Sequence, residues 1–280
     1  MTKEMTTSFD QAALWNGRAG ATWVAKQALL DDLFAPIADA LADAVEAAGA
    51  RHLLDIGCGT GATTLAVARR IGEGGTALGI DISAPMVARA TERGAAEGLP
   101  VRFIEGDAQS KAFAPTAFDM AISRFGVMFF SDSVAAFANI RQAMTPGGLL
   151  HAIAWRGPRD NGFMTAAERA AQPLLPAMPA RDPEAPGQFA FADKDCVLGL
   201  LWDAGWSDID IEATDFACAF PASALADYVA SMGPLGLFLA QVDGAERARI
   251  VDQVLPAFDR YIDGDAVRFT AACWSIRARA

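Results

Sequence analysis

Apolar and polar positions along the chain predict helices and strands that follow one another in turn. Leu33, Ile37, Leu41 and Val45 recur every four residues, with acidic residues off that face, which predicts an amphipathic helix within residues 29–48. Further on, the pattern predicts strands at 52–56, 76–82, 101–107, 118–125 and 149–155, and helices at 62–71, 83–98 and 132–144. This alternation is typical of a doubly wound α/β fold with a mostly parallel sheet.

The pattern changes after Trp155. Residues 157–188 are rich in proline and indicate a loop around one short helix near 163–172. A helix at 193–206 and a strand at 207–216 are expected next, then a helical stretch at 222–262 that a Gly-Pro pair interrupts. Alternating positions at 266–278 predict a long terminal strand.

Charge and composition narrow the classes of partner. The formal net charge is −11, with 23 basic residues against 34 acidic ones, which argues against a nucleic-acid partner because phosphate binding depends on Lys and Arg. The opening MTKEMTTSFDQ lacks the apolar core of a secretory signal, and no apolar run is long enough for a membrane span. Four scattered cysteines favour reduced thiols, no metal site and a cytoplasmic location.

One stretch combines a strand with a run of glycines: LLDIGCGTG, residues 53–61. Glycines between a strand and a helix leave backbone N–H groups free near the positive end of that helix, although a tight turn without a ligand has the same pattern. Asp81 closes the next predicted strand, where an acid can accept hydrogen bonds from both ribose hydroxyls. The spacing of Gly57, Gly59 and Gly61 is G-x-G-x-G, not the dinucleotide fingerprint G-x-G-x-x-G.

The DIGCGTG loop resembles the first motif of class I S-adenosylmethionine-dependent methyltransferases. GIDIS at 79–83, EGDAQ at 105–109, FDMAISRFGVMFF at 118–130 and TPGGLL at 145–150 resemble the later motifs in the same order. WNGRAGATWVAKQ resembles a bacterial branch related to the ubiquinone and menaquinone biosynthesis methyltransferases. The resemblance implies S-adenosyl-L-methionine as cofactor and a seven-stranded Rossmann-like sheet with an antiparallel terminal strand and a helical cap.

The resemblance also implies a role for each motif residue. The glycines would surround the methionine part of the cofactor, Asp81 would bind the ribose, and Asp107 would accept a hydrogen bond from the adenine amino group. In the resembling branch the N-terminal segment folds over the cofactor, and this implies that Trp23 is one of the cofactor residues. The implied cofactor residues are Trp23, Asp55, Gly57, Gly59, Gly61, Asp81, Ile82, Met86, Asp107, Ala108 and Ser123.

The expected acceptor is a small or medium organic molecule, apolar or aromatic, methylated at O, N or C by direct in-line transfer. Sequence features of nucleic-acid methyltransferases are missing, because Ser123 is followed by Arg-Phe-Gly and no Pro-Cys pair occurs. The expected pocket residues are Trp15, Arg124, Phe125, Met128, Phe129, Tyr228, Met232 and Phe238, for each of which core packing is the alternative. Arg124 has a further alternative, a neighbouring acid. His52 and His151 are expected to be structural, and the sequence identifies no catalytic base.

These expectations divide the chain into three parts. Residues 1–48 would form an N-terminal helical segment over the cofactor site, residues 49–156 the cofactor-binding core, and residues 157–280 the rest of the sheet with a cap insertion at 222–262. A homodimer is compatible with the sequence. Two other functions stay open: a methyltransferase-like protein that binds the cofactor without catalysing transfer, and an NAD-dependent oxidoreductase, which shares the strand–helix pattern but not the glycine spacing.

Overall fold

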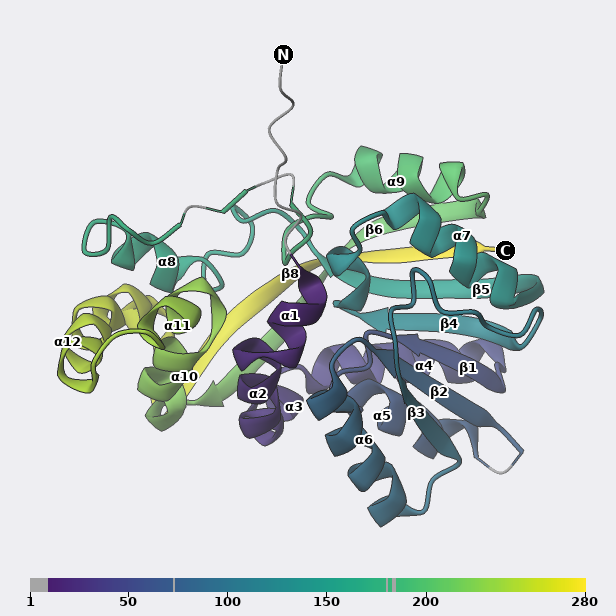
Figure 1. The fold of residues 1–280 in the computed structure, drawn as a ribbon, viewed down its shortest axis with the longest axis horizontal. Coiled ribbons are helices and arrows are strands. Elements are labelled where there is room, and N and C mark those ends of the chain that lie inside the picture. Colours follow the sequence, from purple (N-terminus) through teal and green to yellow (C-terminus); the bar gives the residue numbers. More distant parts are fainter. Residues whose placement is uncertain (1–9, 73, 180, 183–184) are drawn as a thin grey trace.

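The computed structural model describes residues 10–72, 74–179, 181–182 and 185–280 (Figure 1). The expectation for the first residues of the chain, that they lack a signal core, falls on residues 1–9 and so lies outside the described residues. The described chain forms one large mixed sheet with helices on both faces and a helical region at one end (Figure 1).

The sheet has the strand order β3-β2-β1-β4-β5-β8-β6, and the two-residue β7 pairs with β8 beside this path. Strands β1 to β5 are parallel to their neighbours, whereas β8 lies antiparallel between β5 and β6. The strands are β1 (His52–Ile56), β2 (Thr76–Asp81), β3 (Val101–Glu105), β4 (Phe118–Arg124), β5 (Met144–Trp155), β6 (Ser207–Pro221), β7 (Ile262–Asp263) and β8 (Ala266–Arg279). The predicted seven-stranded path with an antiparallel terminal strand is confirmed.

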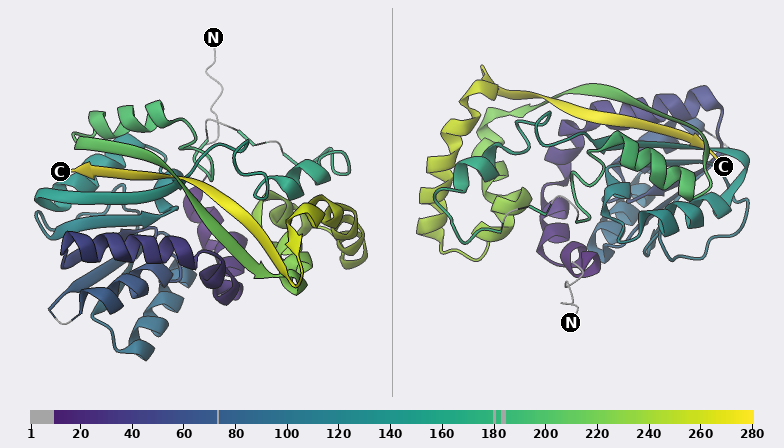
Figure 2. Two further views of the ribbon diagram at one scale, coloured as in Figure 1. Left: turned by 180° about the vertical axis from the view of Figure 1, so that it is seen from behind. Right: turned by 90° about the horizontal axis from the view of Figure 1, so that it is seen from above.

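Helices cover both faces of this sheet. Helix α4 packs beside α5 and α7 beside α9, and Figure 2 shows α4 and α9 on opposite faces. The helices of the N-terminal segment and core are α1 (Gln11–Asn16), α2 (Arg18–Ala25), α3 (Gln27–Leu33), α4 (Ala35–Ala48), α5 (Ala62–Ile71), α6 (Ala84–Glu97), η1 (Gly126–Phe129) and α7 (Ser133–Ala143). Those of the last third are α8 (Ala166–Ala171), α9 (Lys194–Asp203), η2 (Ala222–Ala224), α10 (Leu225–Ser231), α11 (Gly233–Leu239), α12 (Gly244–Val254) and η3 (Leu255–Tyr261).

The four-residue apolar repeat of the first predicted helix is divided between two helices. Ile37, Leu41 and Val45 are fully buried along α4, but Leu33 is the last residue of α3, because the chain turns at Phe34. Pro36 stands in the first turn of α4, where its missing N–H has no partner to lose. One apolar face therefore continues across a bend that the repeat alone does not show.

The TPGGLL segment differs from its prediction. The sequence pattern predicts a strand that begins at Leu149, yet β5 begins at Met144 and the glycines lie within the strand. Gly147 has φ +75°, and the register with β4 shifts between Phe118 and Met120. The Pro-Gly-Gly sequence is thus accommodated as a strand irregularity, which is a common place for glycine in a sheet.

Beyond the sheet, β6 and β8 continue as a two-stranded ribbon toward the cap, which is formed by residues 222–262 (Figure 1). The predicted break within the cap is confirmed, since Gly233 has φ +67° and begins α11, with Pro234 in its first turn. Across this break, segments Ala222–Ser231 and Gly233–Leu239 bend by 65°. Within the described residues, no single helix is long and apolar enough to cross a membrane, although this bent pair passes that test by length and composition.

The N-terminal helices are fixed to the end of β2 by specific hydrogen bonds. Ser83 occupies the N-cap position of α6, but its hydroxyl donates to the carbonyl of Trp15 at 2.6 Å and does not cap the helix. Asn16 donates to the carbonyl of Ile82 at 2.9 Å and accepts from the N–H of Ala84 at 2.8 Å. These bonds place the tryptophan-bearing segment over the strand ends.

Candidate functional site

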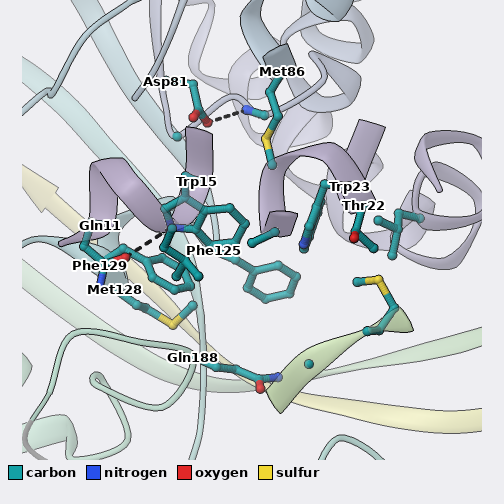
Figure 3. Close-up of a pocket in the computed structure, with 18 of the residues that line it drawn as sticks. Gln11, Trp15, Thr22, Trp23, Asp81, Met86, Phe125, Met128, Phe129 and Gln188 are labelled. Carbon is teal, nitrogen blue, oxygen red and sulfur yellow. Dashed lines mark hydrogen bonds between the residues drawn. The ribbon is translucent and has the colours of Figure 1, made fainter. Parts of the chain in front are cut away.

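A cavity of about 760 Å³ opens at the carboxyl ends of β1, β2 and β4 (Figure 3). The N-terminal helices, η1, the proline-rich stretch and the cap supply its other walls. Open α/β sheets bind ligands at this edge, and the volume lies in the upper part of the range of roughly 300–1,000 Å³ for ligand sites. The cavity is therefore the candidate site.

The glycine loop, residues 57–61, uses its three glycines in two different ways. A Cβ on Gly57 would lie 2.6 Å from Gly126 Cα, and one on Gly61 would lie 3.0 Å from Ala90 Cβ, so both glycines serve close packing inside the protein. A Cβ on Gly59 would meet just the sulfur of Met86, at 3.7 Å, and φ at Gly59 is +54°. Gly57 and Gly59 line the cavity, whereas Gly61 does not, and its contact with the cofactor stays a prediction.

Asp81 stands at the end of β2 and faces the cavity. One carboxylate oxygen accepts the N–H of Gly59 at 2.8 Å, and the other accepts the N–H of Ser83 at 2.9 Å (Figure 3). Burial raises the pKa of Asp81, while these N–H groups act in the opposite direction. Each oxygen keeps the capacity for another hydrogen bond, so the carboxylate is held in place and can still accept from a ligand.

Asp55 lies behind the loop and not on the cavity wall. Its side chain is 1% exposed; Oδ2 accepts the hydroxyl of Thr64 at 2.6 Å, and Oδ1 has no hydrogen-bond partner among the described residues. Burial, with a smaller contribution from the charge of Asp81, raises the pKa of Asp55 to about 6. Asp55 therefore lies beneath the loop, and its contact with the cofactor stays a prediction.

Ser123 is also behind the wall, at the end of β4. It is fully buried, its hydroxyl donates to the carbonyl of Ile56 at 2.7 Å, and the same oxygen accepts the N–H of Gly126 at 3.1 Å. This side chain ties β1 to β4 where Gly57 and Gly126 meet. These hydrogen bonds indicate that Ser123 positions the ends of β1 and β4. Its side chain does not line the cavity.

The residues expected beside an adenine ring do line the cavity: Ile82, Met86, Asp107 and Ala108. One oxygen of Asp107 accepts the N–H of Gln109 at 2.8 Å. The N–H of Ala108 has no acceptor among the described residues, whereas its carbonyl accepts the side-chain amide of Asn139 at 2.8 Å. A flat ligand with both a donor and an acceptor at its edge fits this pair.

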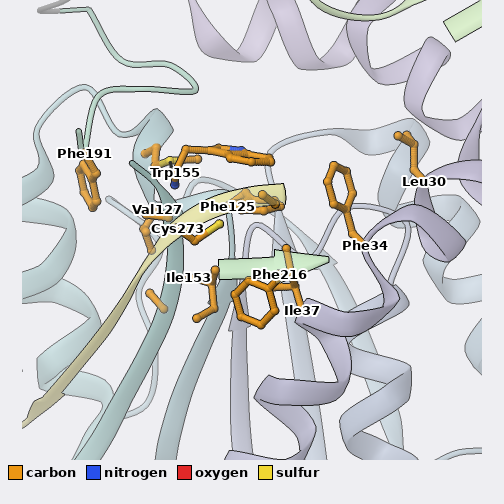
Figure 4. Close-up of a cluster of buried hydrophobic side chains, with 14 of the residues drawn as sticks. Leu30, Phe34, Ile37, Phe125, Val127, Ile153, Trp155, Phe191, Phe216 and Cys273 are labelled. Atoms are coloured by element: carbon orange, nitrogen blue, oxygen red, sulfur yellow. Dashed lines mark hydrogen bonds between the residues drawn. The ribbon is translucent and has the colours of Figure 1, made fainter. Parts of the chain in front are cut away.

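Two aromatic groups form much of the remaining wall. Trp15 contacts Trp23 and Phe129 edge-on, with ring centroids 6.1 and 5.2 Å apart. Phe125 stacks on Trp155 with ring centroids 4.5 Å apart, and Phe34 contacts Phe125 edge-on with centroids 5.3 Å apart (Figure 4).

The backbone of Phe125 has φ +70°, a conformation that bulky side chains rarely adopt. Its N–H donates to the carbonyl of Ile153 at 2.9 Å, and stacking on Trp155 holds its ring. Strain of this kind is concentrated at functional sites. Phe34 and Trp155 were missing from the sequence prediction, because nothing local in the sequence distinguishes them from core residues.

The cap contributes Tyr228 and Met232 to the wall, as predicted, but Phe238 does not line the cavity and its neighbour Leu237 does. The hydroxyl of Tyr228 has one contact among the described residues, the sulfur of Met164 at 3.9 Å, and burial raises the pKa of the phenol. Trp15, Arg124, Phe125, Met128 and Phe129 also line the cavity, so seven of the eight predicted pocket residues lie there. The proline-rich stretch adds Phe163, Met164, Glu168, Arg181 and Gln188.

Neither histidine belongs to the cavity wall. His52 bonds to the hydroxyl of Thr76 at 3.0 Å, and His151 bonds to that of Ser275 at 2.9 Å. Burial, with the charge of Arg277, lowers the pKa of His151 to about 4. Within the described part of the chain, no group of His, Cys, Asp and Glu side chains is arranged to hold a metal ion.

Comparison with known proteins identifies the central region. Residues 53–148 match a family model described as a methyltransferase domain. The chain is 40% identical to nocamycin O-methyltransferase of Saccharothrix syringae over 119 residues, 42% of each protein. It is 34% identical to demethylmenaquinone methyltransferase of Thermus thermophilus over 113 residues, 40% of this chain and 51% of that enzyme. The methyltransferase resemblance of the sequence is thereby confirmed.

The aligned regions cover part of each relative. The chain spans 42% to 62% of the length of the named curated relatives it matches. Among solved structures, the cyclase SpnF is similar with a TM-score of 0.55 and 23% identity, covering 93% of this chain and 95% of that one. This likeness shows the fold, and it also shows that a fold of this kind does not define one reaction.

Proposed function

We propose that this chain, whose residues 53–148 form a methyltransferase domain, transfers a methyl group from S-adenosyl-L-methionine to a small or medium organic acceptor. The observation that carries the proposal is the joint position of Gly59, Asp81 and Asp107 on the wall of one cavity at the carboxyl edge of the sheet. This arrangement supports a ligand that combines an adenosine with an amino-acid tail.

The residues present fit that cofactor. Asp81 has spare acceptor capacity for two ribose hydroxyls, and the free N–H of Ala108 lies near the carboxylate of Asp107 to bind the edge of an adenine. Ile82 and Met86 supply the apolar surfaces for the ring. The open space at Gly59 leaves room for the close approach of the methionine part, and Trp23 covers this end of the cavity from the N-terminal segment.

The reaction requires little acid–base catalysis from the protein. S-adenosylmethionine supplies a methyl group on a positively charged sulfur, which departs as a neutral thioether. The chain has to align an acceptor with that methyl group and exclude water, and positioning of this kind lowers a barrier by several kcal/mol. Phe125, Met128 and Tyr228 would hold the acceptor, and their apolar surfaces support an aromatic or otherwise hydrophobic molecule.

The remaining sequence predictions stay as proposals. We retain the division into a covering segment at 1–48, a cofactor-binding core at 49–156, and a sheet-completing part at 157–280 with its cap. A homodimeric state and a cytoplasmic location are also proposals of this kind. A small-molecule acceptor agrees with the named relatives, one an O-methyltransferase and one a quinone-pathway methyltransferase by its name.

Calorimetry with S-adenosylhomocysteine tests the cofactor assignment. Wild-type protein should bind this product with a micromolar dissociation constant and should not bind NAD. Asp81→Ala should weaken binding roughly ten- to a hundredfold, because two ribose hydrogen bonds lose their acceptor. Asp107→Ala should have a smaller effect, since the N–H of Ala108 still contacts the adenine. NAD binding without a signal for S-adenosylhomocysteine contradicts the assignment.

A turnover assay tests methyl transfer separately from cofactor binding. Transfer of a deuterated methyl group to any member of a panel of aromatic acceptors, detected by mass spectrometry, is the expected result. Tight cofactor binding with no methylated product from a broad panel would favour the alternative of a non-catalytic binding protein.

A further inference from the structure

Arg124 occupies an unusual place in the cavity wall. It is the last residue of β4 and precedes Phe125, whose left-handed backbone turns the chain away from the sheet. Its guanidinium lies over the ring of Phe34, 5.6 Å from the centroid, and donates one long hydrogen bond, 3.4 Å, to the carbonyl of Phe34. The side chain is partly buried, and its remaining surface faces the cavity.

Arg124 has no close carboxylate partner in the part of the chain that the structure describes. Within the described residues, no Asp or Glu oxygen lies within 4.0 Å of its guanidinium. The other arginine of the wall is different, because Arg181 pairs with Glu168 at 2.6 Å. Removal from water lowers the pKa of Arg124, and the more distant carboxylates of Asp31 and Asp55 oppose this effect. A positive charge withdrawn from water without a close counter-ion is costly, and an anionic ligand would relieve the cost.

The nearby acids are already engaged. Asp31 pairs with Arg93 at 2.6 Å, which prevents it from serving as the close partner of Arg124. The other acidic residues of the described wall each accept a hydrogen bond or form an ion pair: Asp10, Asp81, Asp107 and Glu168. The wall therefore offers one unsatisfied cation, among aromatic rings, and no histidine to act as a base.

We propose that the acceptor is an anion, an aromatic or apolar molecule with an ionised oxygen, and that Arg124 binds this oxygen. The inference rests on the proposed methyltransferase function and names the chemical class of its second substrate. Phe34 and the Phe125–Trp155 stack surround the guanidinium with flat apolar surface, which suits a ring bearing the charged group at its edge. A guanidinium also matches the geometry of a carboxylate with two parallel hydrogen bonds.

Where the bound oxygen is itself the reacting atom, such binding removes the need for a base. A cation beside an acidic oxygen favours its ionised form. An acceptor that arrives ionised has a nucleophilic electron pair and no proton to lose during transfer. If the oxygen bound by Arg124 is the methylated one, the new C–O bond forms as the C–S bond breaks, and the electron pair of that bond stays on sulfur. If it is a separate anchor, Arg124 orients the acceptor and the reacting atom lies elsewhere on it.

The test compares charged and neutral probes of matched shape in the presence of saturating S-adenosylhomocysteine. The first pair is 2-naphthoate and 2-naphthamide. The second, used at about pH 9 to separate a phenolate from a carboxylate, is ionised 7-hydroxycoumarin and 7-methoxycoumarin. Wild-type protein should bind the charged member of at least one pair roughly tenfold more tightly, as expected for charge-assisted hydrogen bonds. Three tryptophans of the wall, Trp15, Trp23 and Trp155, provide the fluorescence signal.

Variants of Arg124 then test whether this residue causes the preference for charged probes. Arg124→Met should bring the affinities of the charged and neutral probes within about threefold, and Arg124→Lys, which retains the charge, should keep most of the preference. Far-UV circular dichroism and S-adenosylhomocysteine affinity serve as controls for folding, and both should match those of the wild type. These controls also separate this inference from the proposed function, which fails if the wild-type protein does not bind S-adenosylhomocysteine.

Three results would overturn the inference. The first is a wild-type protein that binds S-adenosylhomocysteine yet does not distinguish the charged probes from the neutral ones. The second is an Arg124→Met variant that keeps the preference. The third is a loss of S-adenosylhomocysteine affinity in Arg124→Met with unchanged affinity for methylthioadenosine, which lacks the amino-acid tail. That pattern would assign the arginine to the carboxylate of the cofactor.

Discussion

Replacing Asp55 by Asn tests the electrostatics beneath the glycine loop. Burial raises the pKa of this carboxyl from 3.8 to about 6, so the folded protein holds the proton more tightly than the unfolded chain does. The resulting stability is fully present below pH 4 and is lost as the pH rises through 6. The whole shift corresponds to about 3 kcal/mol. The part that falls between pH 5 and pH 8 is about 1.4 kcal/mol.

Asp55→Asn removes the ionisation and leaves the other groups unchanged. The difference in unfolding free energy between Asp55→Asn and wild type should therefore change by about 1.4 kcal/mol in favour of the variant between pH 5 and pH 8. Because this is a difference of differences, altered hydrogen bonding to Thr64 largely cancels. Urea unfolding followed by tryptophan fluorescence measures it.

A matched control is Asp252→Asn, since Asp252 is exposed on α12. Its stability difference from wild type should stay constant between the two pH values. Equal pH dependence in wild type and Asp55→Asn would refute the reasoning, because it would mean that Asp55 ionises in the folded protein as easily as in water.

Two further substitutions test the roles assigned to the loop and the cap. Gly57→Ala places a Cβ 2.6 Å from the backbone of Gly126 and should cost more than about 2 kcal/mol in urea unfolding, whereas Gly49→Ala, with φ +65° and open space, should cost about 1 kcal/mol; equal losses would contradict the packing role. Tyr228→Phe should alter stability by less than about 0.5 kcal/mol, because the hydroxyl contacts just a sulfur at 3.9 Å. The hydroxyl has no oxygen or nitrogen partner among the described residues, and we expect it to donate to the acceptor. Its removal should lower kcat/KM for a methyl acceptor by roughly tenfold, the effect of one lost hydrogen bond, and an unchanged kcat/KM would exclude a hydrogen bond from Tyr228 to the acceptor.

The sequence was sufficient for features that depend on neighbours along the chain. Asp81 ends β2 and Asp107 lies two residues after β3. Parallel strands present their carboxyl ends at one edge of a sheet, so both residues were expected at one site. The break in the cap was likewise predictable, because a Gly-Pro pair interrupts a helix wherever it occurs.

Features that depend on distant contacts were beyond the sequence pattern. Gly61 belongs to the motif, yet its need for glycine comes from Phe103 and Ala90, which approach it from a neighbouring strand and helix. Phe34 and Trp155 have the spacing of core residues, and their contact with Phe125 arises when the N-terminal segment folds onto β4 and β5. The exchange of Phe238 for Leu237 has a similar cause, since the 65° bend sets which face of α11 meets the cavity.

A crystal structure with S-adenosylhomocysteine tests the central claim most directly. The account predicts the adenine between Ile82 and Met86, both ribose hydroxyls on Asp81, and the sulfur directed toward the half of the cavity that Phe125 and Tyr228 line. A ligand bound away from Asp81, or a sulfur directed away from Phe125 and Tyr228, would contradict it.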